Sequence, residues 1–371
     1  MSALSGIEPG ALLDLAAVLV DIASPSRAES TLAGEVERFL SAVPWLAVER
    51  IGDNVVARTD NGRAQRLVLA GHLDTVPPQG NGVARVDGDT LWGVGACDMK
   101  GTLAVMLDLA RTLETPAVDA TYVFYAREEI AASESGLEEL FEVAPHLLVA
   151  DAAVLGEPSA GGVEAGCQGT MRVRLRLHGE AAHTARAWMG RNAIHRLGSV
   201  LSDLARFESR RPIVNGLQFH EAAQAVYVEG GTAGNVVPDR AELTVNLRFA
   251  PDRTSADAEA AFRSLVGVHL DPHDDFEVLD RAEAAWPALD HLLLTPLTAE
   301  LGLEVRPKLG WTDVARFSAR GTPAINVGAG DAVLAHRADE HVTAAELHHV
   351  DAVYRRLLGG QSRRSTETTL P

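Results

Sequence analysis

The chain contains 371 residues, 46% of them apolar, and this length and composition indicate two globular domains. Acidic residues outnumber basic residues by 51 to 33, and the net charge of −18 argues against a general affinity for nucleic acid or anionic membranes. The two cysteines fit a reducing cytoplasm, and we recognise neither a secretory signal nor a membrane-spanning run. We therefore expect a cytoplasmic protein with no nucleic-acid or membrane partner.

Two amphipathic helical segments come first, at residues 11–22 and 30–40. Short apolar runs that suit strands then follow, separated by helical segments such as residues 102–113. These runs are residues 66–70, 121–125, 152–155 and 324–327. The alternation predicts an α/β fold whose central sheet is mixed but largely parallel, and such sheets bind ligands beyond the carboxyl ends of their strands.

The pattern changes between residues 169 and 283. Residues 171–178 and 242–249 alternate apolar and polar side chains, as strands with one solvated face do. Helical runs at residues 192–207 and 256–266 complete this region. We interpret it as an inserted α+β domain with an antiparallel sheet, and we assign residues 1–168 and 284–371 to a discontinuous catalytic domain.

Residues suited to metal chemistry follow the predicted strands. Asp98 lies on a glycine-rich turn at residues 93–101, just before a helical run. A hydrolytic metal site needs imidazole and carboxylate ligands together with a base that accepts a proton from water. The residues that could supply these groups are His72, Asp74, Asp98, Glu128, Glu129, Glu157 and His336. Together they predict a two-metal amide hydrolase site.

Two short motifs suggest how the roles divide. If residues 72–74 are extended, the side chains of His72 and Asp74 point the same way, so that Asp74 would accept a hydrogen bond from the far ring nitrogen of His72. Neighbouring side chains diverge in Glu128-Glu129, which suits one metal ligand and one general base. Taken singly, each motif also has a common structural explanation. His72 and Asp74 could be a hydrogen-bonded surface or core pair, and Glu128-Glu129 could be part of a solvated face.

Other classes of protein remain open at this point. The glycine-rich turn lacks the third glycine of a dinucleotide fingerprint, which disfavours a nucleotide-binding protein. A non-catalytic metal-binding protein would have no need for a base beside a metal ligand in the Glu128-Glu129 pair. Cys97, next to Asp98, is a second possible ligand, although a small buried filler is the commoner role.

The ordered motifs resemble those of the co-catalytic dizinc peptidase and deacylase family, which includes aminoacylase, acetylornithine deacetylase and succinyl-diaminopimelate desuccinylase. The resemblance covers nearly the whole chain and lies in residues 71–77, 93–101, 128–129, 156–158 and 336–340. It implies a dizinc aminopeptidase-like catalytic domain, an inserted lid domain that forms a homodimer, and a cis peptide after the bridging aspartate, here Asp98-Met99.

The resemblance also implies a ligand set, residue by residue. Asp98 would bridge two zinc ions, with His72 and Glu157 completing one site. Glu129 and His336 would complete the other. Cobalt or manganese would suit the same nitrogen and oxygen ligands.

Three residues take catalytic roles by the same resemblance. Glu128 would be the general base, and Asp74 would orient the ligand His72. His183, in residues 179–185, would reach the active site of the partner subunit and stabilise the oxyanion. Asn235 would make a second contact of this kind.

Substrate recognition follows from the remaining motifs. Arg248 resembles the arginine that binds a substrate carboxylate, and Thr312 lies in a loop that resembles a substrate contact. Residues 166–170, 183–188 and 310–313 look closest to the actinobacterial type of succinyl-diaminopimelate desuccinylase. This implies hydrolysis of the small anionic amide N-succinyl-L,L-2,6-diaminopimelate to succinate and L,L-2,6-diaminopimelate, in lysine and diaminopimelate biosynthesis. Another deacylase or carboxypeptidase of the family, such as acetylornithine deacetylase, stays an alternative.

Overall fold

The computed structural model describes residues 2–359, in which the chain divides into two compact units. The first unit contains the residues up to Ala165, Ala288–Arg306 and the residues from Arg316 onward. The second contains Gly166–Pro287 and the short segment Pro307–Ala315, which the sequence prediction had placed in the catalytic domain.

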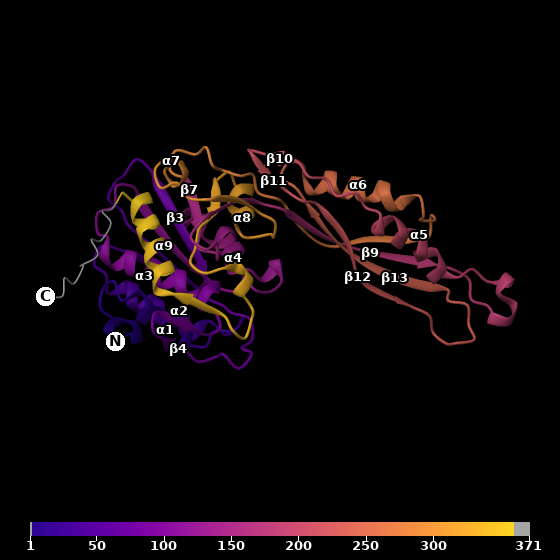
Figure 1. Cartoon of the computed structure of the whole chain (residues 1–371), viewed down its shortest axis with the longest axis horizontal. Coiled ribbons are helices and arrows are strands. Elements are labelled where there is room, and N and C mark those ends of the chain that lie inside the picture. The colour runs from indigo at the N-terminus through magenta and orange to yellow at the C-terminus, as the bar shows by residue number, and fades with distance from the viewer. Residues whose placement is uncertain (1, 360–371) are drawn as a thin grey trace. The chain divides into compact units, whose positions relative to one another are not determined.

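An eight-stranded sheet forms the centre of the first unit (Figure 1). Its strands, in spatial order, are β1 (Ala47–Ile51), β2 (Asn54–Arg58), β6 (Asp119–Tyr125), β3 (Arg66–His72), β7 (Ala152–Leu155), β16 (Ala324–Asn326), β8 (Val163–Cys167) and β15 (Val305–Lys308). The four central strands, β6, β3, β7 and β16, run parallel, whereas β1, β2 and β8 pair antiparallel with their neighbours. The prediction of a mixed, largely parallel sheet is therefore confirmed.

Burial explains why the central strands read as continuous apolar runs. All seven residues of β6 are buried, as are the residues of β3 from Leu67 onward. Helix α3 (Gly101–Thr112) packs against α1 (Leu12–Asp21) and α9 (Ala344–Leu357). The other helices of this unit are α2 (Ser30–Ser41), α4 (Gly136–Val143), α7 (Pro296–Ala299) and α8 (Val314–Ala319), whose first residues belong to the second unit.

A second, smaller sheet in the first unit was not predicted from the sequence. Its strands, in spatial order, are β17 (His341–Thr343), β5 (Thr90–Trp92) and β4 (Arg85–Asp87). These strands have three residues each, and β4 is exposed throughout, so no apolar alternation marks them. Strand β17 follows the loop that carries His336.

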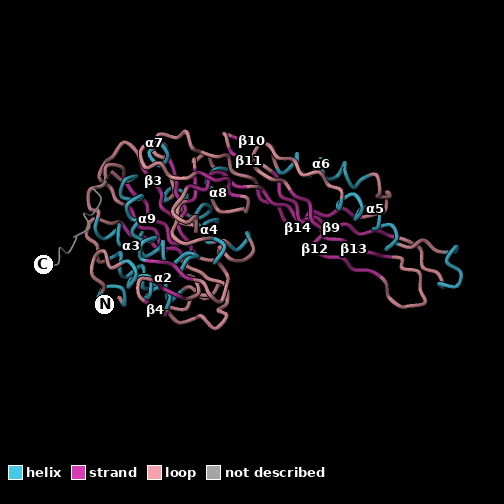
Figure 2. The backbone as a smooth tube through the Cα atoms, viewed as in Figure 1, coloured by secondary structure: helices cyan, strands magenta, loops and turns pink. Residues whose placement is uncertain are grey.

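The second unit is built on a four-stranded antiparallel sheet (Figure 2). Its strands, in spatial order, are β12 (Ala222–Gly230), β13 (Arg240–Phe249), β9 (Gly169–His178) and β14 (Asp275–Ala282), and a short hairpin joins β10 (Ile213–Val214) to β11 (Leu217–Gln218). Helices α5 (Ala193–Ala205) and α6 (Ser255–Gly267) pack against the apolar face of this sheet. The alternating side chains of β9 fall on opposite faces, so the predicted antiparallel α+β module is confirmed.

No helix within residues 2–359 is long and apolar enough to cross a membrane.

Candidate metal centre

Parallel strands bring the candidate ligands to one edge of the first unit. His72 is the last residue of β3, and the Glu128-Glu129 pair and Glu157 follow the neighbouring strands β6 and β7. Because the carboxyl ends of parallel strands meet at the same edge, residues far apart in the sequence become neighbours. His336 enters from the loop between β16 and β17.

A tight turn presents Asp98 to this edge. Gly95 has a φ of 80°, and a Cβ at this position would lie 2.7 Å from Cγ2 of Thr75, so the turn requires glycine. The Asp98-Met99 peptide is cis, as expected. The backbone N–H groups of Cys97 and Asp98 both donate to Oε1 of the buried Glu340, at 3.1 Å each. Sequence reasoning had included Glu340 in a motif but had given it no role.

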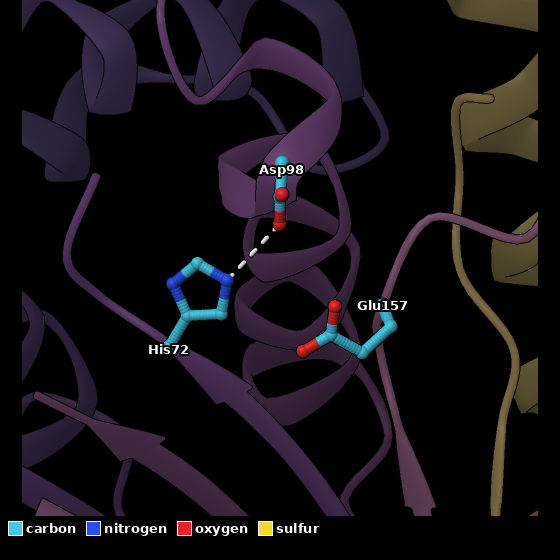
Figure 3. Close-up of side chains that lie close together, drawn as sticks. All are labelled: His72, Asp98 and Glu157. Atoms are coloured by element: carbon cyan, nitrogen blue, oxygen red, sulfur yellow. Dashed lines mark hydrogen bonds and ion pairs between the residues drawn. The ribbon is translucent and has the colours of Figure 1, made fainter. Parts of the chain in front are cut away.

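Two groups of potential ligand atoms share Asp98. In the first, His72, Asp98 and Glu157 offer atoms that all lie within 4.8 Å of one another, as Figure 3 illustrates. In the second, Asp98, Glu129 and His336 do the same. Imidazole nitrogens and carboxylate oxygens in groups of three suit divalent ions of the zinc type. The donor set therefore fits two metal ions bridged by Asp98.

The backbone fixes the tautomer of His72. Its Nδ1 lies 2.9 Å from the carbonyl oxygen of Asp74, whereas the nearest carboxylate oxygen of Asp74 is 3.6 Å away. Since a carbonyl only accepts, Nδ1 carries the proton and Nε2, 3.1 Å from Oδ1 of Asp98, is left to bind a metal. The oxygen that orients His72 is therefore the main-chain carbonyl oxygen of Asp74. The sequence had correctly indicated Asp74, but it had predicted the carboxylate as the hydrogen-bond acceptor.

The carboxylate of Asp74 instead holds the acidic loop after β6. It is completely buried and accepts hydrogen bonds from the backbone N–H groups of Glu128 (2.9 Å) and Glu129 (3.1 Å). The hydroxyl of Ser26 donates to the same carboxylate over 2.7 Å. Asp74 therefore positions both the candidate base and a candidate ligand, a contact that the sequence did not reveal.

The histidines are strongly influenced by these carboxylates. Burial alone would lower the pKa of His72, but the negative carboxylates of Asp74 and Asp98 close to its ring raise it well above its usual value. Nε2 of His336 lies 2.8 Å from Glu129 and 3.4 Å from Asp98. Hydrogen bonds with Asp98 and Glu129 raise the pKa of His336 to about 10. In the metal-free protein, protons thus occupy positions at which a metal ion would bind.

Glu128 also lies beside this cluster. One of its carboxylate oxygens falls within 4.8 Å of ligand atoms of His72 and Glu129. Since His72 belongs to the first ligand group and Glu129 to the second, Glu128 lies beside both groups.

Two of the predicted catalytic and substrate residues lie together in an exposed part of the second unit. The backbone N–H of Thr184, next to His183, donates to the carbonyl of Asn235 over 3.0 Å. Nδ1 of His183 accepts a hydrogen bond from the backbone N–H of Ala185 over 3.1 Å. Nδ1 therefore lacks a proton in this arrangement, so a neutral His183 presents its Nε2–H outward as a donor.

The remaining two substrate candidates lie near the start of β9. Arg248 is partly buried on β13, opposite Thr170, and burial lowers the pKa of its guanidinium. Thr312 is buried, and its carbonyl lies 3.8 Å from Sγ of Cys167. Both cysteines are free and buried, and burial raises the pKa of Cys97 and brings that of Cys167 to about 11.

A largely parallel α/β sheet with two three-residue groups of candidate ligands that share one aspartate is typical of one class of protein, the dinuclear metallohydrolases. The model of peptidase family M20/M25/M40 matches residues 68–359. The chain belongs to this family.

Three relatives illustrate the similarity. A Corynebacterium glutamicum protein named succinyl-diaminopimelate desuccinylase is 42% identical, covering 92% of this chain and 94% of its own. A Mycobacterium tuberculosis protein provisionally named succinyl-diaminopimelate desuccinylase DapE is 47% identical over 94% of this chain and 98% of its own. The Bacillus subtilis YXEP protein, described as a dinuclear metal binding peptidase of family M20, superposes with a TM-score of 0.69 at 17% identity, over 94% and 96% of the two chains.

Proposed function

We propose that this protein hydrolyses N-succinyl-L,L-2,6-diaminopimelate to succinate and L,L-2,6-diaminopimelate, in the biosynthesis of diaminopimelate and lysine. The observation that carries the proposal is the pair of ligand groups that share Asp98, with Glu128 beside them. The two desuccinylases described above support the choice of substrate, since the similarity extends over nearly the full length of all three chains.

Two divalent ions, most simply zinc, would be held by these groups. His72, Asp98 and Glu157 would hold one ion, and Asp98, Glu129 and His336 the other. When bound, the ions would polarise the amide carbonyl and lower the pKa of a water molecule toward neutrality. Cobalt and manganese suit the same ligands and remain alternatives to zinc.

The chain's own residues move the proton. Glu128 accepts it from the attacking water and passes it to the nitrogen of the leaving amine, so that the amine departs neutral. The hydrogen bonds from the backbone of this loop to Asp74 keep Glu128 facing the ligand cluster. This arrangement lowers the barrier because the base is already in position when the substrate binds.

The second unit would supply recognition. The Nε2–H of His183 donates to the developing oxyanion, with Asn235 beside it. Arg248 binds a substrate carboxylate, and Thr312 contacts the substrate. A guanidinium is well matched to a carboxylate because it donates two parallel hydrogen bonds.

We further propose that the protein is a homodimer through its second unit, and that His183 acts in the active site of the partner. Strand β12 supports this, since it is an edge strand with exposed apolar side chains at Val226, Tyr227 and Val228. Such an edge favours pairing with a second strand. A cytoplasmic location belongs to the same proposal and is supported by the free thiols.

The substrate is tested by amide hydrolysis with metal-reconstituted protein. Wild-type protein should cleave N-succinyl-L,L-2,6-diaminopimelate in preference to N-acetylornithine, and Glu128→Ala should lose this activity while still binding metal. Cleavage of N-acetylornithine alone would contradict the substrate, and cleavage of neither compound would contradict the proposed reaction.

A further inference from the structure

Glu29 is a completely buried carboxylate that has no part in the roles above. It immediately precedes α2, and its Oε1 accepts a hydrogen bond from the backbone N–H of Arg127 over 3.1 Å. Its Oε2 has no hydrogen-bond partner within residues 2–359. Burial raises the pKa of this carboxyl, and the nearby charge of Asp74 adds to the effect. Burying such a group destabilises the folded state, and groups of this kind are concentrated at functional sites.

The residue that Glu29 holds directly precedes the proposed base. Arg127 has a φ of 61°, in the left-handed region that side chains other than glycine rarely adopt. Its side chain donates to the carbonyl of Glu134 and to Oε2 of Glu139, at 2.6 Å each. The unusual conformation is therefore fixed by both the backbone and the side chain of Arg127.

Two carboxylates hold three consecutive backbone N–H groups in this loop. Glu29 accepts from Arg127, and Asp74 accepts from Glu128 and Glu129. The N–H groups of Glu128 and Glu129 belong to the two peptides that flank the α-carbon of Glu128, and Asp74 holds both. Glu29 holds the peptide just before them, between Ala126 and Arg127, so the two carboxylates together restrict the backbone that leads into Glu128.

Residues 24–29, which end in Glu29, are held beside Asp74 by hydrogen bonds. The hydroxyl of Ser24 donates to the carbonyl of Leu73 over 2.8 Å, and that of Ser26 donates to Asp74 over 2.7 Å. The backbone N–H of Ser26 also donates to the carbonyl of Thr75 over 3.2 Å. Residues 24–29 therefore have a fixed place relative to the strand end that carries His72.

We propose that Glu29 is a positioning residue for the hydrolysis, which holds the Arg127 peptide so that the carboxylate of Glu128 stays aimed at the attacking water. The inference rests on the proposed function and goes beyond it. Glu29 acts through the backbone of the loop and is not itself one of the proposed substrate-binding residues. Its loss should therefore affect kcat more than KM.

The test compares substitutions of Glu29 in the metal-reconstituted full-length protein. Glu29→Ala should lower kcat by about tenfold or more while KM stays near the wild-type value, since small displacements of a catalytic group have large effects on rate. Glu29→Gln should retain most of the wild-type kcat, because its amide oxygen still accepts from Arg127. Glu37→Ala is the matched control on α2, where Glu37 is partly exposed and pairs with Arg50.

A second measurement does not depend on activity. Amide hydrogen exchange of the metal-free protein, followed in the peptide that contains Arg127, should be faster in Glu29→Ala than in wild type. It should be close to wild type in Glu29→Gln. This comparison tests the contact even if the protein cleaves a different amide, in which case kcat is compared on that amide.

Three results would overturn the proposal. They are a folded Glu29→Ala protein with wild-type kcat, a loss of kcat fully accounted for by loss of bound metal, and unchanged exchange at Arg127. If Glu29→Ala does not fold, Glu29→Asp replaces it, because the shorter side chain withdraws the acceptor from Arg127 yet keeps the charge. Wild-type kcat in Glu29→Asp would then refute the role. A wild-type protein without amidase activity would instead refute the proposed function.

Discussion

Protonation of His72 and His336 should control how readily the proposed centre takes up metal. An imidazole nitrogen binds a metal ion only after it has lost its proton, so metal and proton compete for the same position. In the metal-free protein the pKa of His336 is raised to about 10, and that of His72 also lies well above its usual value. Near neutral pH both side chains therefore carry a proton that an arriving ion must displace.

This competition predicts that zinc binding releases protons and strengthens as the pH rises from 6 to 9. Isothermal titration calorimetry at one pH, in buffers with different enthalpies of ionisation, measures the protons released. The heats should depend on the buffer, and His336→Ala should release fewer protons than wild type. Heats independent of the buffer, with an affinity that does not change with pH, would contradict the assigned protonation of His72 and His336.

At the same scale, the sequence pointed to the candidate ligands but not to the residues that hold them in place. His72 and Glu157 could be recognised because each follows a short apolar run. The residues that hold the candidate site in place could not be recognised in this way, because their contacts join distant parts of the sequence. Glu29 and Arg127 are 98 residues apart, and Glu340 and Cys97 are 243 residues apart. Contacts of this range depend on the folded path of the chain, as does the choice of the Asp74 carbonyl over its carboxylate as the partner of His72.

Among the elements, the turn between β5 and α3 carries Asp98, the residue that both groups of candidate ligands share. Its conformation depends on the two N–H groups of Cys97 and Asp98 that donate to Glu340. Removing a buried acceptor costs about 1 to 3 kcal/mol for each donor left unpaired. The stability of the turn should therefore depend strongly on this one side chain.

We accordingly expect Glu340→Ala to lower the free energy of unfolding of the metal-free protein by about 2 kcal/mol or more and to weaken metal binding. Glu340→Gln, which keeps an oxygen acceptor, should lose less of both. Urea denaturation and a competition assay with a metal chelator measure the two effects. The exposed neighbour Asp339, changed to Ala, serves as control, and equal stability of Glu340→Ala and this control would refute the expectation.

The central strands of the first unit could be predicted from the sequence. They are buried on both faces of the sheet, so they appear as continuous apolar runs, as in β6 and β3. The second unit could be predicted for the opposite reason, since one solvated face gives the strict alternation of β9. The short strands β4, β5 and β17 carry neither signal. They form because the folded chain brings them side by side. A local sequence pattern cannot predict such tertiary contacts.

At the scale of the whole molecule, the proposed homodimer would be needed for activity. The exposed apolar edge of β12 predicts a dimer in solution, and the proposed role of His183 makes that dimer necessary for full activity. A charged residue on the edge should prevent pairing. Dimer formation and kcat should then change together.

The double variant Val226→Lys and Val228→Lys should therefore sediment as a monomer in analytical ultracentrifugation and lose most of its kcat. The metal content should be unchanged, because the proposed ligands all lie in the first unit. Val268→Lys is the matched control, since Val268 is an exposed valine after α6 and away from the edge strand. A fully active monomer would show that the partner contributes nothing to the site.

The most direct test of the proposed two-metal centre is to locate the metal ions. Crystals of the zinc-reconstituted protein, measured at wavelengths on either side of the zinc absorption edge, should show two anomalous peaks on opposite sides of the Asp98 carboxylate. One peak should be bound by His72 and Glu157, and the other by Glu129 and His336. A single peak, or two peaks that do not share Asp98, would contradict the two-metal centre on which the proposed hydrolysis depends.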